Sequence, residues 1–237
     1  GQCNFAGTSY YYDGFLAKLN PAGSALIYST YFGGANGDWG NAIGLNSNNE
    51  AYITGRTYAP DFPTSSGAFD TTCGTDGNCD FFNNTLFYDA FAMRFDSECT
   101  CPIYSTFLGG QNVETGAAIA VDSAGAAYIT GNTASDDFPT SNGFDDACGT
   151  DGQCDPENNL VYFDGFAVKL TPDGTDLTYG TYFGGSNGDG GNGIAVGPNG
   201  GAFITGYTYS SSGFPTTSGA FDRNHDGLID GFALKLA

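Results

Sequence analysis

The sequence repeats itself with a period of roughly 75 residues, and this self-similarity constrains its fold more than any other feature. The pattern YSTYFGG at residues 28–34 returns as YSTFLGG at 104–110 and as YGTYFGG at 179–185. An Asp-(Gly/Ala)-Phe landmark begins at four places, Asp13, Asp89, Asp164 and Asp230. A repeat of this length is one supersecondary unit, which buries its apolar face only by stacking on its neighbours.

Each repeat contains four short segments of strand-like pattern, which predict four β-strands. In the first repeat these are residues 15–19, 26–32, 42–45 and 51–54, and a long loop follows. Four strands and a connector form one propeller blade, so we expect an all-β chain of three four-stranded propeller-type blades. We place the blade repeats at 1–87, 88–161 and 162–230, and the first strand of a fourth repeat at 231–237.

Four landmarks recur together: Asp-(Gly/Ala)-Phe-x-x-(Lys/Arg), Tyr-Ser-Thr-Tyr-Phe-Gly-Gly, Ala-Tyr-Ile-Thr-Gly and Asp-Phe-Pro-Thr. In these features the chain resembles the SBBP family, a β-propeller repeat of bacterial secreted and surface proteins. The resemblance covers nearly the whole chain. It implies propeller blades, an extracellular or cell-surface location and no catalytic residues. The chain departs from the family pattern in its long loops, which carry cysteines.

Three blades do not close a ring, because closed propellers have at least four. We therefore expect an incomplete propeller that neighbouring copies close or extend, as a six-bladed ring of two copies or as a filament. The alternative is a fragment of a longer propeller. The chain begins without Met and inside a loop, which is typical of a processed or partial chain.

Seven cysteines bear on the compartment. Cys73 and Cys79 bracket one loop, and Cys148 and Cys154 bracket its counterpart in the next repeat. This recurrence predicts one disulfide in each loop and hence an oxidising environment. Cys3 has its counterpart position before residue 1, so it is a candidate for an intermolecular bond. A bond from Cys3 to Cys99 or Cys101 is the alternative.

Residues 222–230 have the form D-x-N-x-D-G-x-x-D, which matches the start of a calcium-binding loop. The candidate ligands are Asp222, Asn224, Asp226, Leu228 and Asp230. The expected acid at position twelve is replaced by Ala233. Two further loops repeat the Asp-Gly-x-x-Asp half of the pattern and add the candidates Asp76, Asp80, Asp151 and Asp155. Oxygen ligands favour Ca²⁺ over transition metals, although solvated Asp-Gly turns give the same pattern.

The formal net charge is −20, from 26 acidic and 6 basic residues. Such a chain lacks the clustered cations that nucleic acids require. No apolar run is long enough for a membrane-spanning helix, so we expect no membrane insertion. There is no Cys-x-x-Cys-His for haem, and no Gly-rich loop precedes a helix, so we expect neither haem nor a nucleotide. With His225 as the single histidine, a nucleophile–base pair is not indicated, and we expect no enzyme.

Four of the six basic residues occupy one position, three residues after the landmark Phe: Lys18, Arg94, Lys169 and Lys235. We expect each to pair with a carboxylate of a loop or of a neighbouring blade, and the acids that also recur at one position, Asp38, Glu114 and Asp189, are candidate partners. We interpret these pairs as structural.

Two functions fit these features. The first is an extracellular structural protein that associates with itself into a filament or larger surface assembly, braced by calcium and disulfides. The second is a secreted propeller-type binding module for glycan or protein ligands.

Overall fold

In the computed structural model all regular elements of the described residues are β-strands, which confirms the all-β prediction. The structure describes residues 5–6, 9–10, 12–74, 77, 79, 81–82, 85–99, 101–149, 154 and 163–237. Thirteen strands have six to eight residues: β3 (Gly14–Leu19), β4 (Leu26–Phe32), β5 (Asp38–Leu45), β6 (Ala51–Thr57), β9 (Asp89–Phe95), β10 (Pro102–Leu108), β11 (Glu114–Val121), β12 (Ala127–Thr133), β13 (Asp164–Leu170), β14 (Leu177–Phe183), β15 (Asp189–Val196), β16 (Ala202–Thr208) and β17 (Asp230–Leu236). Four others have two residues each: β1 (Phe5–Ala6), β2 (Ser9–Tyr10), β7 (Phe81–Phe82) and β8 (Thr85–Leu86).

The longer strands form four antiparallel sheets. Two sheets have four strands, in the orders β5-β6-β9-β10 and β11-β12-β13-β14. The other two are the hairpin β3-β4 and the three-stranded sheet β15-β16-β17. The expectation of three four-stranded blades is therefore met by two sheets, and the described residues form no closed barrel.

Apart from the β3-β4 hairpin, each of these sheets draws its strands from two successive sequence repeats. We expected the long loop after the fourth predicted strand to lead to the next blade. Instead, the long loop returns the chain to the same sheet, where β9 pairs with β6 in an unbroken register from Ala51↔Phe95 to Thr57↔Asp89. The short Gly-Gly turn is the link between sheets. The grouping was wrong because sequence periodicity gives the repeat length but not which loop crosses between sheets.

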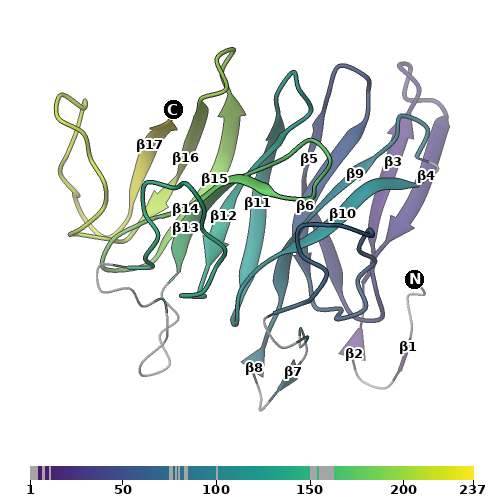
Figure 1. Ribbon diagram of the computed structural model, residues 1–237, viewed down its shortest axis with the longest axis horizontal. Helices are drawn as coiled ribbons and strands as arrows, with labels where there is room; N and C mark the ends of the chain where they lie inside the picture. The colour runs from purple at the N-terminus through teal and green to yellow at the C-terminus, as the bar shows by residue number, and fades with distance from the viewer. Residues whose placement is uncertain are drawn as a thin grey trace.

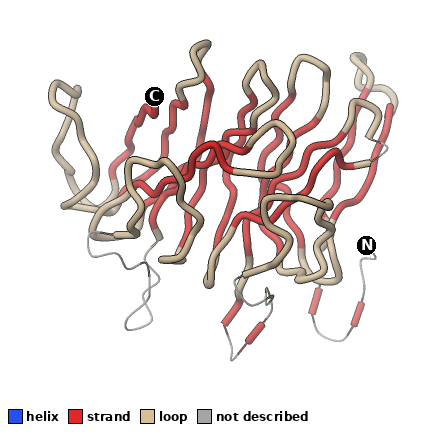
Figure 2. The backbone as a smooth tube through the Cα atoms, in the orientation of Figure 1, coloured by secondary structure: helices blue, strands red, loops and turns tan. Residues whose placement is uncertain are grey.

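The sheets stand side by side, with the β3-β4 hairpin and β17 at opposite ends (Figure 1). Tubes through the backbone show the loops gathered above and below the strands (Figure 2). Neighbouring sheets are joined by hydrogen bonds at equivalent positions, each from a tyrosine of one sheet to a glycine in the first turn of the next sheet. The Tyr52 hydroxyl donates to the Gly125 carbonyl at 3.1 Å, and the Tyr128 hydroxyl donates to the Gly200 carbonyl at 3.1 Å.

The core consists of aromatic and aliphatic side chains at repeated positions. The largest fully buried side chains are Tyr52, Tyr104, Tyr128, Tyr182, Phe91, Phe107, Phe166, Phe183, Met93, Leu108, Ile129 and Leu170. Strands β9 and β13 are buried on both faces because each lies inside a sheet that is covered on both sides. The same landmark sequence in β17 alternates between half-buried and exposed residues.

The long loops also protect the outer strands. Beside β10, the Ser65 amide donates to the Ser105 carbonyl at 2.9 Å and the Phe107 amide donates to the Asp70 carbonyl at 3.1 Å. Beside β14, the Tyr182 amide donates to the Asp145 carbonyl at 3.1 Å. An uncovered outer strand would expose a row of unpaired backbone groups that templates association.

Gly131 lies opposite the bulge between Gly116 and Ala118 on β11, where the two backbones come close together. A Cβ atom on Gly131 would collide with the Thr115 carbonyl, so Gly131→Ala is expected to destabilise the fold by about 1–3 kcal/mol. Gly188→Ala is the control, because its new Cβ would meet only the Tyr209 ring at 3.8 Å. Urea unfolding of both variants tests this, and equal midpoints would contradict it.

Candidate functional site

The predicted calcium loop is an exposed turn in which carboxylates cap the backbone. Asp222 accepts a hydrogen bond from the Asn224 amide at 3.0 Å, and Asp230 accepts one from the Asp226 amide at 2.7 Å. Gly227 has a φ of 101°, which this turn requires. Leu228, the fourth candidate ligand, has its side chain in solvent. Calcium binding in this loop stays a prediction.

Only one group of three metal-ligating side chains converges in the described residues: Cys73, Cys79 and Asp89. The two sulfur atoms form a disulfide, so they are not available as thiolate ligands. The candidates Asp76, Asp80, Asp151 and Asp155 lie outside the described residues, as does Cys3.

Both predicted disulfides, Cys73–Cys79 and Cys148–Cys154, are present and buried. Each closes a loop of the same size and is held against the following strand by a buried carboxylate. The Gly74 amide donates to Asp89 Oδ2 at 2.9 Å, and the Gly149 amide donates to Asp164 Oδ2 at 2.8 Å. The disulfides fit an extracellular location. In addition, no helix among the described residues is long and apolar enough to cross a membrane.

A second set of buried carboxylates lies at the start of each sheet, where the sequence analysis expected ion pairs. Asp38, Glu114 and Asp189 are each at most 1% exposed. Each accepts a hydrogen bond from the second glycine of the Gly-Gly turn: Gly34 at 2.8 Å, Gly110 at 3.1 Å and Gly185 at 2.8 Å. These acids therefore hold the link between two sheets.

Pairing of the recurring cations with loop carboxylates is confirmed for Arg94 and Lys169, but the candidate partners Asp38, Glu114 and Asp189 were wrong. Among the described residues the ion pairs are Arg94–Glu50 at 2.6 Å and Lys169–Asp122 at 3.4 Å. Both acids lie beside the turn between the first two strands of a sheet, at the end away from the Gly-Gly turns. Strand direction explains this, because three residues after the landmark Phe the chain has reached the opposite end of the sheet.

Burial raises the pKa of these carboxyl groups. The pKa of Asp38 rises to about 6, and burial is the main cause, while a hydrogen bond from Thr57 opposes it. The pKa of Glu114 rises to about 7 for the same reason, against hydrogen bonds from Ser135 and Thr133. Burial also raises the pKa of Asp164 to about 7, and the neighbouring Asp189 adds to the rise.

The acids form pairs across each sheet junction. The charge of Glu114 raises the pKa of Asp89, after burial, and both side chains pack on one Gly-Gly turn. A Cβ on Gly109 would overlap the Asp89 carboxylate, while the Gly110 amide donates to Glu114. A Cβ on Gly110 would in turn overlap the side chains of Asp137 and Ser135, so both residues of the turn are glycine for lack of space. No signal in the sequence except the recurrence of the acids indicated it.

The raised pKa values predict that the protein is less stable at higher pH. Their ordinary values are 3.8 for Asp and 4.5 for Glu, so between about pH 4 and pH 7 the folded state binds more protons than the unfolded chain. The stabilising contribution is complete below pH 4 and is lost as the pH rises through 6 to 7. Melting temperatures measured from pH 4 to pH 8 are expected to fall.

Glu114→Gln is expected to reduce this fall, because it removes one buried ionisable group. Asp136→Asn is the matched control, since it removes the same charge from an exposed position. An equal fall in both variants would show that general charge repulsion, rather than the buried acids, causes the pH dependence.

A row of aromatic side chains lies beside these acids on the first complete sheet. The ring centroids of Trp39 and Tyr58 are 5.2 Å apart, and those of Tyr58 and Tyr88 are 4.8 Å apart. Tyr12 extends the row at 6.1 Å from Trp39. The Arg56 guanidinium lies over the Trp39 ring at 5.1 Å and over the Tyr88 ring at 5.4 Å. This row leaves no local pattern in the sequence, because its members are far apart in the chain.

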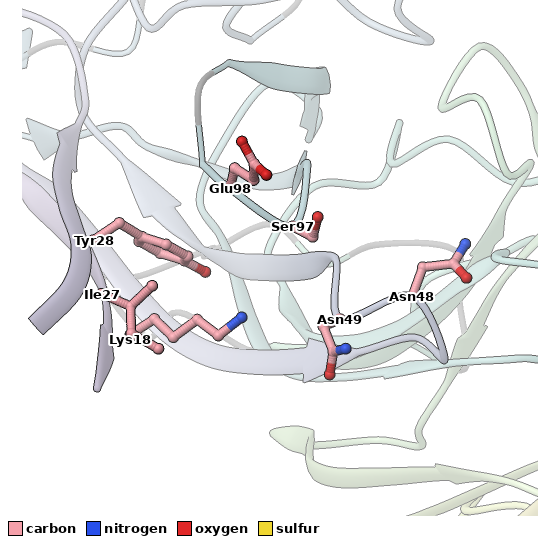
Figure 3. Close-up of a pocket in the computed structure, with 7 residues that line it drawn as sticks. All are labelled: Lys18, Ile27, Tyr28, Asn48, Asn49, Ser97 and Glu98. Atoms are coloured by element: carbon pink, nitrogen blue, oxygen red, sulfur yellow. The ribbon is translucent and has the colours of Figure 1, made fainter. Parts of the chain in front are cut away.

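A polar pocket lies at the opposite end, between the β3-β4 hairpin and two turns of the next sheet (Figure 3). It is lined by Lys18, Ile27, Tyr28, Asn48, Asn49, Ser97 and Glu98. The Lys18 side chain extends across it toward Asn49. Burial, with the nearby Cys99 and Asp96, raises the pKa of Tyr28.

The repeated hairpins, sheet links and landmark residues can now be compared with known families. Residues 103–139 match SBBP, a beta-propeller repeat. This confirms the resemblance inferred from the sequence. The matched SBBP segment begins in β10, passes through β11 and β12 and ends in the following loop, so it crosses from one sheet into the next. No curated protein matches the chain.

Proposed function

We propose that this chain is an extracellular, non-catalytic structural protein that associates with copies of itself into a filament or larger surface assembly. Contacts between blades hold the copies together, and disulfide-closed and calcium-binding loops brace them. The observation that carries this proposal is the apolar, incompletely paired state of the two end sheets.

The β3-β4 hairpin exposes aromatic residues whose counterparts on β9 and β10 are buried. Phe15 is 70% exposed and Tyr31 is 68% exposed, whereas Phe91 and Phe107 at the equivalent positions are 0% exposed. The difference arises because no sheet or long loop among the described residues covers the outward face of β3, whereas Phe91 packs on Phe32 of the preceding hairpin and on Phe62 of the long loop. Contiguous apolar surface of this kind is typical of protein–protein contacts.

The C-terminal sheet is similarly open. β17 pairs with β16 and with no other described strand, and Phe203 on β16 is 47% exposed. Association of the two end sheets would bury both surfaces and pair both edges. Each copy has a net charge of −20, so association also brings like charges together, and bound calcium would reduce that repulsion.

Negative-stain electron microscopy of the purified protein, first in calcium and then in excess chelator, tests the proposal. We expect ordered filaments or closed rings in calcium, and their dissociation in chelator. Assemblies that survive chelation would support the structural role but remove calcium from the contacts. Isolated single copies in both conditions would contradict self-association.

The aromatic row favours a second candidate function, a binding module for glycans. Aromatic faces with an adjacent guanidinium can stack on sugar rings while the polar edges accept and donate hydrogen bonds. The tyrosine cluster at residues 10–12 contributes at least Tyr12 to this row.

Trp39 reports on this candidate directly, because it is the single tryptophan of the chain. If the row binds glycans, soluble oligosaccharides are expected to shift its fluorescence in a saturable way, and Tyr58→Ala is expected to weaken the binding. Tyr209→Ala provides the control, since Tyr209 occupies the equivalent position in the last sheet, where glycine replaces Trp39. An unchanged spectrum across a glycan panel would count against this function.

A further inference from the structure

In each four-stranded sheet the outer strand lies between the neighbouring strand and a segment of the long loop. β10 pairs with β9 on one edge, and on the other edge it contacts residues 65–70 of the long loop. The Asp70 amide donates to Thr106 Oγ1 at 2.8 Å, and that hydroxyl donates to the Asp70 carbonyl at 3.0 Å. β14 repeats the arrangement, with Asp145 and Thr181 bonded at 3.0 Å and 2.9 Å.

The last sheet has the same loop wall without the outer strand. Residues 217–222 repeat the turn of residues 65–70: the Ala220 amide donates to the Thr217 carbonyl at 3.1 Å, as the Ala68 amide does to Ser65. The glycine in each turn has a positive φ, 85° in Gly219 and 77° in Gly67. Among the described residues no hydrogen bond joins this wall to β17, and Phe221 on it is fully exposed. We call the space between β17 and residues 217–222 the strand slot.

β4 has the sequence and register of the strand that fits this slot. It carries Thr30 where β10 has Thr106 and β14 has Thr181. Its pairing with β3, Phe15↔Tyr31, repeats Phe91↔Phe107 and Phe166↔Tyr182. Thr30 is half-buried and its hydroxyl bonds only to the neighbouring Tyr31 carbonyl among the described residues, whereas its counterparts bond to a loop wall.

β3, the partner of β4, is nearly interchangeable with β17. Residues 13–19 read DGFLAKL and residues 230–236 read DGFALKL, so five of seven positions are identical. Both are the third strand of a blade, the place that β9 and β13 take in the complete sheets. β17 therefore occupies, within its own chain, the position that β3 of another copy could take.

We propose that the β3-β4 hairpin of a second copy replaces β17 on β16 and places its β4 in the strand slot. This rests on the self-association proposed above and names the segments that carry it. The sheet then becomes β15-β16 from one copy and β3-β4 from the next. Pairing of β17 with β16 is replaced by pairing of β3 with β16, and the two strands have nearly the same sequence. The exchange itself therefore costs little free energy. The gain is the burial of Phe15, Tyr31 and Phe221 and the new bonds between Thr30 and Asp222.

A covalent lock on β17 tests the exchange. Phe203 and Lys235 are directly opposite each other on β16 and β17, and the Lys235 ammonium lies over the Phe203 ring at 5.3 Å. In the double variant Phe203→Cys, Lys235→Cys, oxidation would tie β17 to β16, and we expect complete loss of the assembly seen by light scattering and electron microscopy. Phe203→Cys alone, oxidised in the same way, is the control and is expected to assemble like the unmodified chain.

A second variant tests β4 without relying on a disulfide. The amides equivalent to Tyr31, those of Phe107 and Tyr182, donate to the loop wall and not to the neighbouring strand. Tyr31→Pro therefore removes a contact with the second copy while leaving the β3-β4 ladder intact, and we expect it to abolish assembly. Leu26→Pro is the matched control, because β10 has Pro102 at that position.

The outcomes separate this proposal from the one it rests on. If the unmodified chain stays single, self-association itself fails. If it assembles, and the oxidised double variant and Tyr31→Pro assemble equally well, self-association stands but the strand exchange is wrong.

Discussion

The structure depends on one constraint: the middle strands of its sheets are apolar on both faces, so each sheet needs a neighbour on both sides. β9 and β13 satisfy this, and Phe91 and Phe166 at their centres are fully buried. A single repeat cannot satisfy it, which is why the repeats stack and why the sheets share strands between repeats. Wherever the stack ends, an apolar face is left uncovered, as the exposed Phe15 on β3 shows.

In both four-stranded sheets, the strand ends next to the Gly-Gly turns are organised by buried acids rather than by apolar contact. Asp89 and Asp164 accept hydrogen bonds from the disulfide loops, and Glu114 accepts one from the Gly-Gly turn. The loops fixed in this way are the ones that cover the outer edges of β10 and β14. The desolvation of each carboxylate is thus offset by backbone donors, and the same bonds position the segments that protect the sheet edges.

The strands, the two disulfides and the resemblance to the SBBP repeat could be predicted from the sequence, because each leaves a local pattern that recurs with the repeat. It failed where the answer depends on which strands pair. The long loop from β6 to β9 looks like a link between blades, but hydrogen bonding returns β9 to β6 and the short Gly33-Gly34 turn makes the crossing. The partner of Arg94 was missed for the same reason, since Glu50 becomes adjacent only through that pairing.

The distribution of the few basic residues limits how copies of this chain can associate. Of six, Arg94 and Lys169 bond to acids of their own sheets, and Lys18 and Lys235 lie over the rings of Tyr28 and Phe203. Arg56 lies between two aromatic rings. No clustered basic patch is therefore left among these five to attract the acidic surface of another copy. The proposed association must instead depend on apolar burial, strand pairing and counter-ions, and the end sheets offer the first two.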